Sequence, residues 1–245
     1  MLRKLMAPML VLFALAHPVC AGMNLGGMTK AGKNLVVAAT LSDGEVQQLA
    51  SDAARLTDRA NPVAPLDSSQ AKRLNRLTQG MKTAEGLKLD IKVYLVQEVN
   101  AFAMADGTIR VFSGLMDAMT DDEVRYVIGH EIGHVALGHS RKALQAAYAT
   151  SAARDAAAAS GTGIARLSDS VLGELAEKLV HAQHSQAHEN EADQYALRFM
   201  KANNYDTKAA VSALRKLEKM FGNQSNLLAS HPAPGARANA MEKAL

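Results

Sequence analysis

Cysteine is almost absent from this chain, which has one, Cys20, among 245 residues. A single cysteine cannot form an intramolecular disulfide, so metal ligands in this chain would have to be histidines or carboxylates. Tryptophan is missing, and aromatic residues make up only 4% of the chain. Ala, Leu and Met are abundant instead, which favours helices over a β-sandwich. We therefore expect a mostly helical α+β fold without disulfides.

The chain also lacks a strong charge of either sign. Its formal net charge is +3, and it falls to +1 if Arg3 and Lys4 are removed with an N-terminal export signal. A nearly neutral chain offers no extended basic surface for a nucleic acid backbone. We therefore expect no nucleic acid partner.

Long apolar runs are missing as well. The apolar stretch Met6–Ala16 follows two positive charges and is too short to cross a bilayer, which is typical of an export signal. The signal is predicted to span residues 1–21, with cleavage after Ala21. The alternative is lipidation at Cys20, which would anchor the protein to a membrane. The sequence therefore predicts a periplasmic protein, associated with the outer membrane in the second case.

The rest of the chain is long enough for one hydrophobic core. After a loose lead-in over 22–40, we expect a single domain over 41–245. Ser42-Asp43-Gly44-Glu45 is a capping box and predicts a helix over 43–59. A second helix is expected over 67–81, where apolar residues recur at helical spacing.

A short sheet is predicted next. From 87 to 95 apolar residues alternate with polar ones, as in a half-buried strand. Ala105-Asp106-Gly107 is a turn signal between two more strand-like segments, so a hairpin is expected there. Helical patterns follow the sheet. Besides the helix described below, we expect helices over 143–164, from 168 or 170 through 199, from 206 or 207 through 220, and over 236–245.

The most informative motif is His130-Glu131-Ile132-Gly133-His134, in a helix that begins at the capping box Thr120-Asp121-Asp122-Glu123. This helix is apolar around most of its circumference, so polar side chains inside it need a partner. Residues four apart share a helix face, so His130 and His134 can bind one Zn²⁺ through ring nitrogens. Glu131 can accept a proton from a water molecule at the metal. The motif therefore predicts a zinc hydrolase.

Zinc normally has a third protein ligand, and three arrangements compete for it. A histidine six residues after His134 is excluded, because Ser140 occupies that position. A later helix offers Glu189 and Asp193, four residues apart, as a ligand and as a hydrogen-bond partner of a ligand histidine. Glu191 should face away from both. The third arrangement uses His181, His184 and His188, spaced as on one helix face.

The motifs together resemble a known family, the membrane- and envelope-associated zinc peptidases that include HtpX, BepA, the mitochondrial Oma-type protease and LoiP. The hallmark of that family is H-E-x-x-H followed by an E-x-E-A-D string, matched here by Glu189 and Asp193. The similarity to LoiP-like members extends over most of the chain after residue 41. The resemblance implies a gluzincin fold with a small sheet beside the metal helix. It also implies His130, His134 and Glu189 as zinc ligands, and Asp193 as the group that orients a ligand.

The family also carries a late H-P-x-x-x-x-R motif, matched by His231 and Arg237. A late loop histidine approaches the zinc in BepA-like members and restrains their activity. His231 is therefore a candidate switch or substrate contact, and the alternative is an ordinary turn. Arg237 or His231 is also a candidate to stabilise the oxyanion of the reaction. Peptidases of this kind hold a substrate as an added strand at a sheet edge. The candidate edge is formed by Asn100, Ala101, Phe102, Ala103 and Met104.

The predicted function is a zinc metalloendopeptidase, with one Zn²⁺ per chain, that hydrolyses misfolded cell-envelope proteins. Glu131 is the predicted general base. The expected partners are protein or peptide substrates, including outer-membrane proteins or their assembly machinery. An alternative function is that of a latent protease whose site is plugged and which acts as a chaperone-like quality-control factor of the envelope.

Overall fold

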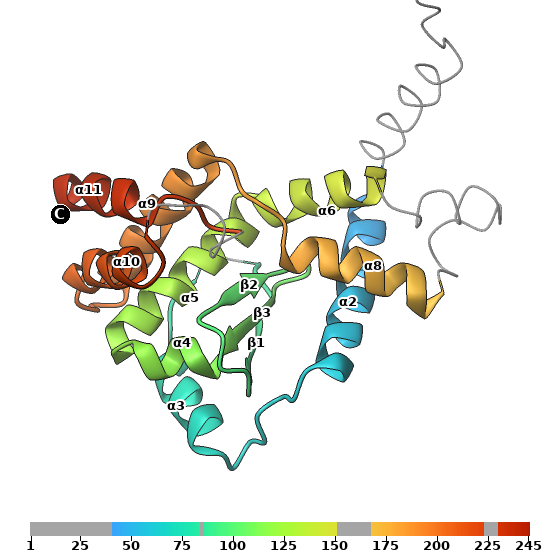
Figure 1. Cartoon of the computed structure of the whole chain (residues 1–245), viewed down its shortest axis with the longest axis horizontal. Coiled ribbons are helices and arrows are strands. Elements are labelled where there is room, and N and C mark those ends of the chain that lie inside the picture. The colour runs from blue at the N-terminus through green and yellow to red at the C-terminus, as the bar shows by residue number, and fades with distance from the viewer. Residues whose placement is uncertain (1–40, 84–85, 151–167, 223–229) are drawn as a thin grey trace, which may run out of the picture.

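A three-stranded sheet lies at the centre of the protein (Figure 1). The computed structural model describes residues 41–83, 86–150, 168–222 and 230–245. The predicted signal with Cys20 and the lead-in over 22–40 lie outside these residues. Strands β1 (Asp90–Tyr94), β2 (Ala101–Ala103) and β3 (Thr108–Phe112) are arranged in the order β1-β3-β2. β1 runs parallel to β3, and β2 runs antiparallel to it.

The predicted hairpin is confirmed by the turn between β2 and β3. The amide of Met104 donates to the carbonyl of Thr108 over 2.8 Å and closes the turn. Gly107 adopts a φ of 90°, and a Cβ there would collide with the backbone carbonyl of Lys88. Glycine is therefore required at this position. The hairpin leaves β2 as an edge strand, as the sequence predicts.

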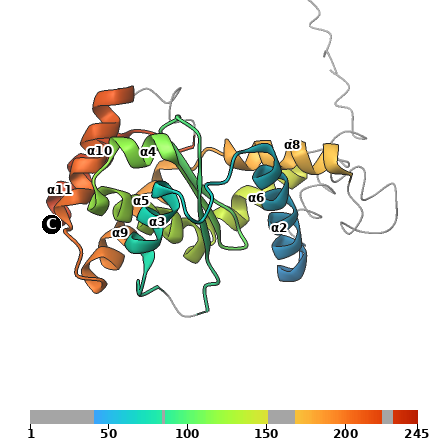
Figure 2. The same cartoon turned by 90° about the horizontal axis from the view of Figure 1, so that it is seen from below.

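The two faces of the sheet are covered by different groups of helices (Figures 1 and 2). Because side chains alternate along a strand, Ile109 and Val111 of β3 face one core, whereas Phe112 faces the other. The first core is formed with α3 (Ser69–Thr78), α4 (Ser113–Ala118), α5 (Asp121–Ala136), α9 (Gln186–Ala202), α10 (Lys208–Phe221) and α11 (Pro234–Ala244). The second core is formed with α2 (Asp43–Ala60), α6 (His139–Thr150) and α8 (Asp169–Val180).

Helix starts agree with the capping signals in the sequence. Ser42 and Glu45 form the predicted capping box of α2, and Thr120 and Glu123 form that of α5. Each box satisfies backbone amides that have no partner within the first turn of a helix. The mostly helical fold with a small sheet beside the motif helix is therefore confirmed. No helix within the four described ranges is both long and apolar enough to span a bilayer.

The prediction of one long helix from 168 or 170 through 199 is wrong. α8 ends at Val180, and α9 begins at Gln186 after Ser185, whose side chain accepts a hydrogen bond from the amide of His188. The break has a tertiary cause. α8 packs in the second core and α9 packs against α5 in the first, so the chain must cross from one side of the sheet to the other.

An ion cluster around the buried side chain of Arg110 joins α2 to the sheet. Arg110 of β3 is 1% exposed, and its guanidinium donates to Asp58 of α2 over 2.7 Å and to Asp90 of β1 over 2.8 Å. Tyr94 also donates to Asp58, over 2.7 Å. Partial burial alone would raise the pKa of Asp58, but the hydrogen bonds from Arg110 and Tyr94 outweigh it and lower that pKa to about 2.

Candidate metal centre

The motif residues lie in the most buried part of α5. His130, Glu131 and His134 are all less than 5% exposed, although each is polar. The Nε2 atoms of His130 and His134 point toward each other and lie 3.0 Å apart. The four-residue spacing therefore places both ring nitrogens at one point, as the sequence predicts.

Helix α9 approaches α5 closely at this point because both helices have small residues at the contact. A Cβ added to Gly133 would lie 3.2 Å from the Cα of Ala192 and 3.1 Å from the Cβ of Tyr195, tighter than most real contacts. The close approach brings Glu189, at the start of α9, to the histidine pair. Its Oε2 is 3.5 Å from Nε2 of His130, and its Oε1 is 3.4 Å from Nε2 of His134.

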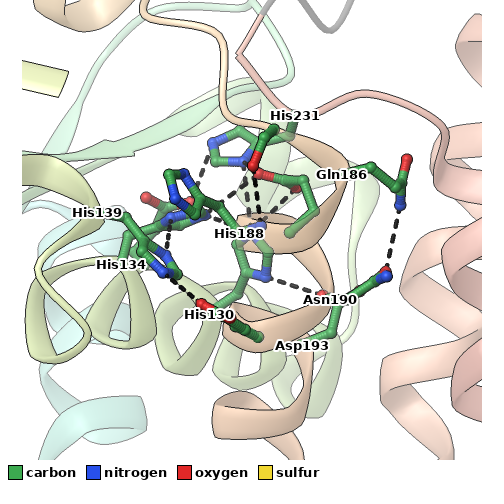
Figure 3. Close-up of polar contacts among 12 residues, drawn as sticks. His130, His134, His139, Gln186, His188, Asn190, Asp193 and His231 are labelled. Atoms are coloured by element: carbon green, nitrogen blue, oxygen red, sulfur yellow. Dashed lines mark hydrogen bonds and ion pairs between the residues drawn. The ribbon is translucent and has the colours of Figure 1, made fainter. Parts of the chain in front are cut away.

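Four side chains form a group that could hold a metal ion: His130, His134, Glu189 and His231. One donor atom from each lies within 4.8 Å of all the others, and this is the one such group among the residues that the structure describes. Figure 3 shows His130, His134 and His231 converging beside α9. Nδ1 of His231 is 3.3 Å from Nε2 of His130 and 3.1 Å from Glu189. The loop histidine therefore lies at the metal position itself.

The charge of the group suits a divalent cation. Glu131, Glu189 and Asp193 are buried carboxylates, and Arg237 is the buried cation beside them. With neutral imidazoles these four groups have a formal charge of −2, which an ion of charge +2 would neutralise. Burial and Arg237 lower the pKa of His130, but hydrogen bonds with Asp193 and Glu189 outweigh both and raise it to about 9. The carboxylates thus favour positive charge at this point.

Asp193 orients the first histidine from the side away from the metal position. Its Oδ1 lies 2.9 Å from Nδ1 of His130 and accepts a 2.6 Å hydrogen bond from the hydroxyl of Tyr126. Both of its oxygens accept from Arg237, over 2.8 and 2.6 Å. Burial would raise the pKa of Asp193, but the charge of Arg237 keeps it below its ordinary range. A carboxylate is therefore fixed at the outer nitrogen of His130.

Arg237 of α11 connects Glu189 and Asp193, two of the three acidic residues of α9. Besides Asp193, its guanidinium contacts Oε2 of Glu189 at 2.6 Å, and the side chain is only 3% exposed. Burial lowers the pKa of Arg237, but Asp193, Tyr126 and Glu189 raise it far more. The structure thus places this arginine against the carboxylates that surround the histidines, where it holds both in place.

One contact near the site was not expected from the sequence, the contact between His139 and Glu191. Nδ1 of His139 is 3.2 Å from Nδ1 of His134, and its Nε2 is 2.9 Å from Oε2 of Glu191. Glu191 faces away from the metal position, as predicted, but it contacts His139. The available signal was Gly138, which follows the C-cap of α5 with a φ of 73° and turns the chain so that α6 can begin at His139.

The alternative ligand set of His181, His184 and His188 is wrong. His181 caps the C-terminus of α8 and His184 lies between the helices, so only His188 is on α9. His184 instead stacks on the ring of His134, with centroids 3.9 Å apart, and His188 stacks on His139 at 4.2 Å. The rings of His184 and His188 therefore pack face to face against the rings of His134 and His139.

The start of the candidate edge strand lies beside the metal group. Asn100 and Ala101 line a cavity of about 40 Å³ together with His130, Glu131 and His231. Ala101 and Phe102 are buried, and Ala103 is half-buried. The remaining walls of the cavity are mostly apolar: Val99, Leu115, Val127, Leu214 and Leu217, with Tyr126 and Arg237.

Comparison with known proteins agrees with this geometry. The model of "Peptidase family M48" matches residues 68–245, which is most of the chain and includes every residue of the metal group. The chain belongs to peptidase family M48. The metalloprotease LoiP of Escherichia coli K12 is 43% identical over 221 residues, which cover 89% of this chain and 88% of LoiP. The metalloprotease YcaL of the same organism is 38% identical over 219 residues, covering 89% of this chain and 86% of YcaL.

A more distant relative is the mitochondrial metalloendopeptidase OMA1 of Arabidopsis thaliana, 28% identical over 177 residues, or 66% of this chain and 34% of OMA1. The M48 assignment confirms the resemblance inferred from the motifs. This M48 chain is therefore a metalloendopeptidase, and its substrates are proteins or peptides.

Proposed function

We propose that this M48 chain is a zinc-dependent endopeptidase that hydrolyses misfolded proteins of the cell envelope. The observation that carries the proposal is the convergence of His130, His134 and Glu189 on one point, with Glu131 next to it. Two imidazoles and one carboxylate are the ligand set that leaves a catalytic zinc with an open position. The roles below follow from that placement.

The bound zinc would act as a Lewis acid that activates water and polarises the peptide carbonyl. Glu131 is adjacent to the first ligand on α5 and almost completely buried. Its carboxylate accepts a proton from the attacking water and returns that proton to the leaving amine. Asp193 and Arg237 hold the outer side of the site and take no proton.

We assign the substrate to the free edge of β2. An extended peptide can add to an edge strand through backbone hydrogen bonds, which do not depend on sequence. Asn100 and Ala101 of this edge line the same cavity as Glu131. The apolar walls of that cavity favour an apolar side chain next to the bond that is cut.

The predicted export signal supports a periplasmic location for the enzyme, either free or anchored to the outer membrane through Cys20. Intact mass spectrometry of the purified mature protein tests this proposal. A mass that begins at Gly22 supports cleavage after Ala21, and a mass that begins at a lipid-modified Cys20 supports the anchor. A mature protein that keeps residues 1–21 would contradict export.

The catalytic proposal is tested with Glu131→Gln. The variant should fold and bind one zinc ion per chain, but its cleavage of casein should fall by at least about 100-fold because it lacks a general base. Wild-type cleavage should stop when a chelator is added and return with zinc. Full activity of Glu131→Gln would refute the assigned mechanism.

A second candidate function is that of a latent protease that retains envelope proteins without cutting them. The position of His231 favours it, because Nε2 of this residue lies 3.4 Å from Glu131 while Nδ1 contacts Glu189. His231 thus occupies space beside the general base that a substrate has to enter. If it restrains activity, His231→Ala should cleave casein several times faster than the wild type. Slower cleavage by this variant would identify His231 as a substrate contact instead.

A further inference from the structure

The second ligand, His134, has its outer nitrogen anchored by another imidazole. Nδ1 of His134 lies 3.2 Å from Nδ1 of His139, and Nε2 of His139 lies 2.9 Å from Oε2 of Glu191. Figure 3 shows His139, His134 and His130 in one continuous row of contacts. His139 is 1% exposed, so water has little access to either of its nitrogens.

If Nε2 of His134 binds a metal, only one arrangement of the ring protons allows both hydrogen bonds of this row, from His134 to His139 and from His139 to Glu191. Nδ1 of His134 must then carry the ring proton and donate a hydrogen bond to an acceptor. Nδ1 of His139 is that acceptor, so the proton of His139 is on Nε2. An ionised carboxylate can only accept hydrogen bonds, and Oε2 of Glu191 accepts the one from Nε2–H of His139. The charge of Glu191 thus selects the tautomer of His139, which in turn selects the tautomer of His134.

We propose that His139 and Glu191 are positioning residues that hold His134 in its metal-binding orientation and tautomer. The proposal rests on the proposed zinc site. Carboxylate partners of ligand histidines raise the basicity of the ring and fix its direction. Here the carboxylate acts through a second imidazole, whereas Asp193 contacts His130 directly.

The local fold supports this role. Gly138 takes the left-handed conformation, so α6 begins at once and His139 turns back over the last turn of α5. His188, from the same helix as Glu191, stacks on the His139 ring with the two planes at 16°. Helix α9 therefore supplies the ligand Glu189, the anchor Asp193 for one histidine and the anchor Glu191 for the other.

The two anchors differ in exposure, which sets the size of the expected effects. The side chain of Glu191 is 58% exposed, whereas that of Asp193 is 4% exposed. If Glu191 is removed, water can therefore accept part of the hydrogen bonding in its place. If His139 is removed, water has less access to Nδ1 of His134, because His134 is fully buried. Partners of ligand histidines contribute roughly 10- to 100-fold to metal affinity. We expect about 10-fold for Glu191 and a larger factor for His139.

The test is the zinc affinity of the full mature protein, measured by competition with a chromophoric chelator. His139→Phe keeps the ring and its stacking but loses both hydrogen bonds, and it should bind zinc roughly 10- to 100-fold more weakly. Glu191→Ala should lose about 10-fold. His139→Asn retains an acceptor oxygen near the Nδ1 position and should recover most of the loss. Glu174→Ala on α8 removes another exposed carboxylate and should leave the affinity unchanged.

A second readout is the visible spectrum of the cobalt-substituted protein, which reports ligand geometry without activity. It should change in His139→Phe and return toward the wild-type spectrum in His139→Asn. Wild-type affinity and spectrum in both His139→Phe and Glu191→Ala would overturn the inference. A wild-type chain that binds no zinc would refute the proposed function itself, so the two failures are distinguishable. Since Glu191 is exposed, Glu191→Ala gives an interpretable result even if His139→Phe does not fold.

Discussion

At the scale of single residues, His130 and His134 both direct Nε2 at the candidate metal position, but different groups contact their outer nitrogens. The spacing of Glu189 and Asp193 made their shared helix face predictable from the sequence. The contact of Glu191 with His139 was not predictable, because it depends on the direction in which α6 leaves Gly138. Periodicity within a helix shows which residues share a face, but not what that face meets.

The metal content of two glutamate variants separates a ligand from a positioning residue. Glu189→Ala removes one of three proposed ligand atoms and should leave the protein without stoichiometric zinc. Glu191→Ala should still contain one zinc ion per chain when zinc is in excess, despite its lower affinity. Elemental mass spectrometry after gel filtration measures both. Equal loss of zinc from the two variants would contradict the assignment of Glu189 as the ligand.

Replacing Asp193 should affect both the metal and the fold. Asp193→Ala removes the partner of His130 and should weaken zinc binding by roughly 10- to 100-fold. It also leaves Arg237, which is 3% exposed, without its main counter-charge, so the free energy of unfolding should fall by about 3 kcal/mol. Urea unfolding with and without chelator separates the two effects. If Asp193→Ala weakens zinc binding without loss of stability in chelator, the structural role of the Arg237 pair is disproved.

At the scale of elements, the site depends on how closely α5 and α9 pack. Ala192 of α9 lies between Glu189 and Asp193 in the sequence, and the structure sets Gly133 of α5 against it. The break between α8 and α9 was missed because no proline or glycine marks it. Ser185, which caps α9, is its local signal, and the two separate cores are its tertiary cause. Local pattern thus predicted the helices better than their ends.

A larger side chain at Gly133 should separate the helices. Gly133→Val places branched carbons against the backbone of Ala192, so α9 must shift and carry Glu189 away from His130. We expect a loss of stability of about 2 kcal/mol and a large loss of zinc affinity. Thermal unfolding and chelator competition measure these effects.

Gly173→Ala is the matched control for Gly133→Val. Gly173 also lies within a helix, but a Cβ there meets nothing within 4 Å. Alanine should therefore stabilise α8 slightly and leave the metal site unchanged. Wild-type zinc affinity in Gly133→Val would show that the close packing of α5 and α9 is not needed to place Glu189.

At the scale of the whole molecule, the cluster around Arg110 ties the N-terminal helix α2 to the sheet. The alternation of β3 predicts that Arg110 lies on the opposite face from Ile109 and Val111, but not that α2 covers that face. Asp58 lies 52 residues before its partner in the sequence. Such a pairing depends on tertiary topology, which composition and periodicity do not specify.

This cluster should make the free energy of unfolding depend on pH in the acidic range. The pKa of Asp58 is about 2 in the folded protein, against about 3.9 in an unfolded chain. A lowered pKa means that the stabilisation is fully present above about pH 4 and is lost as the pH falls toward 2. Asp58→Asn should reduce the free energy of unfolding by about 2 kcal/mol at pH 6.

Urea unfolding at pH 6, 4 and 3 tests this dependence. The difference between the wild type and Asp58→Asn should become smaller at the lowest pH. Asp117→Asn, at an exposed position of α4, should show no comparable difference at any of these values. A gap for Asp58→Asn that stays constant down to pH 3 would mean that Asp58 does not stabilise the fold through its charge.

The C-terminal segment has a consequence for the order in which the enzyme matures. His231 comes 42 residues after Glu189 and Arg237 comes 44 residues after Asp193, yet His231 contacts Glu131 and Arg237 contacts both Glu189 and Asp193. A chain still being synthesised has α5 long before it has these residues. Glu189 and Asp193 would then be without their counter-charge and would repel each other next to an unfinished site. The geometry of the site thus forms only after α11 and the loop before it have folded against α9.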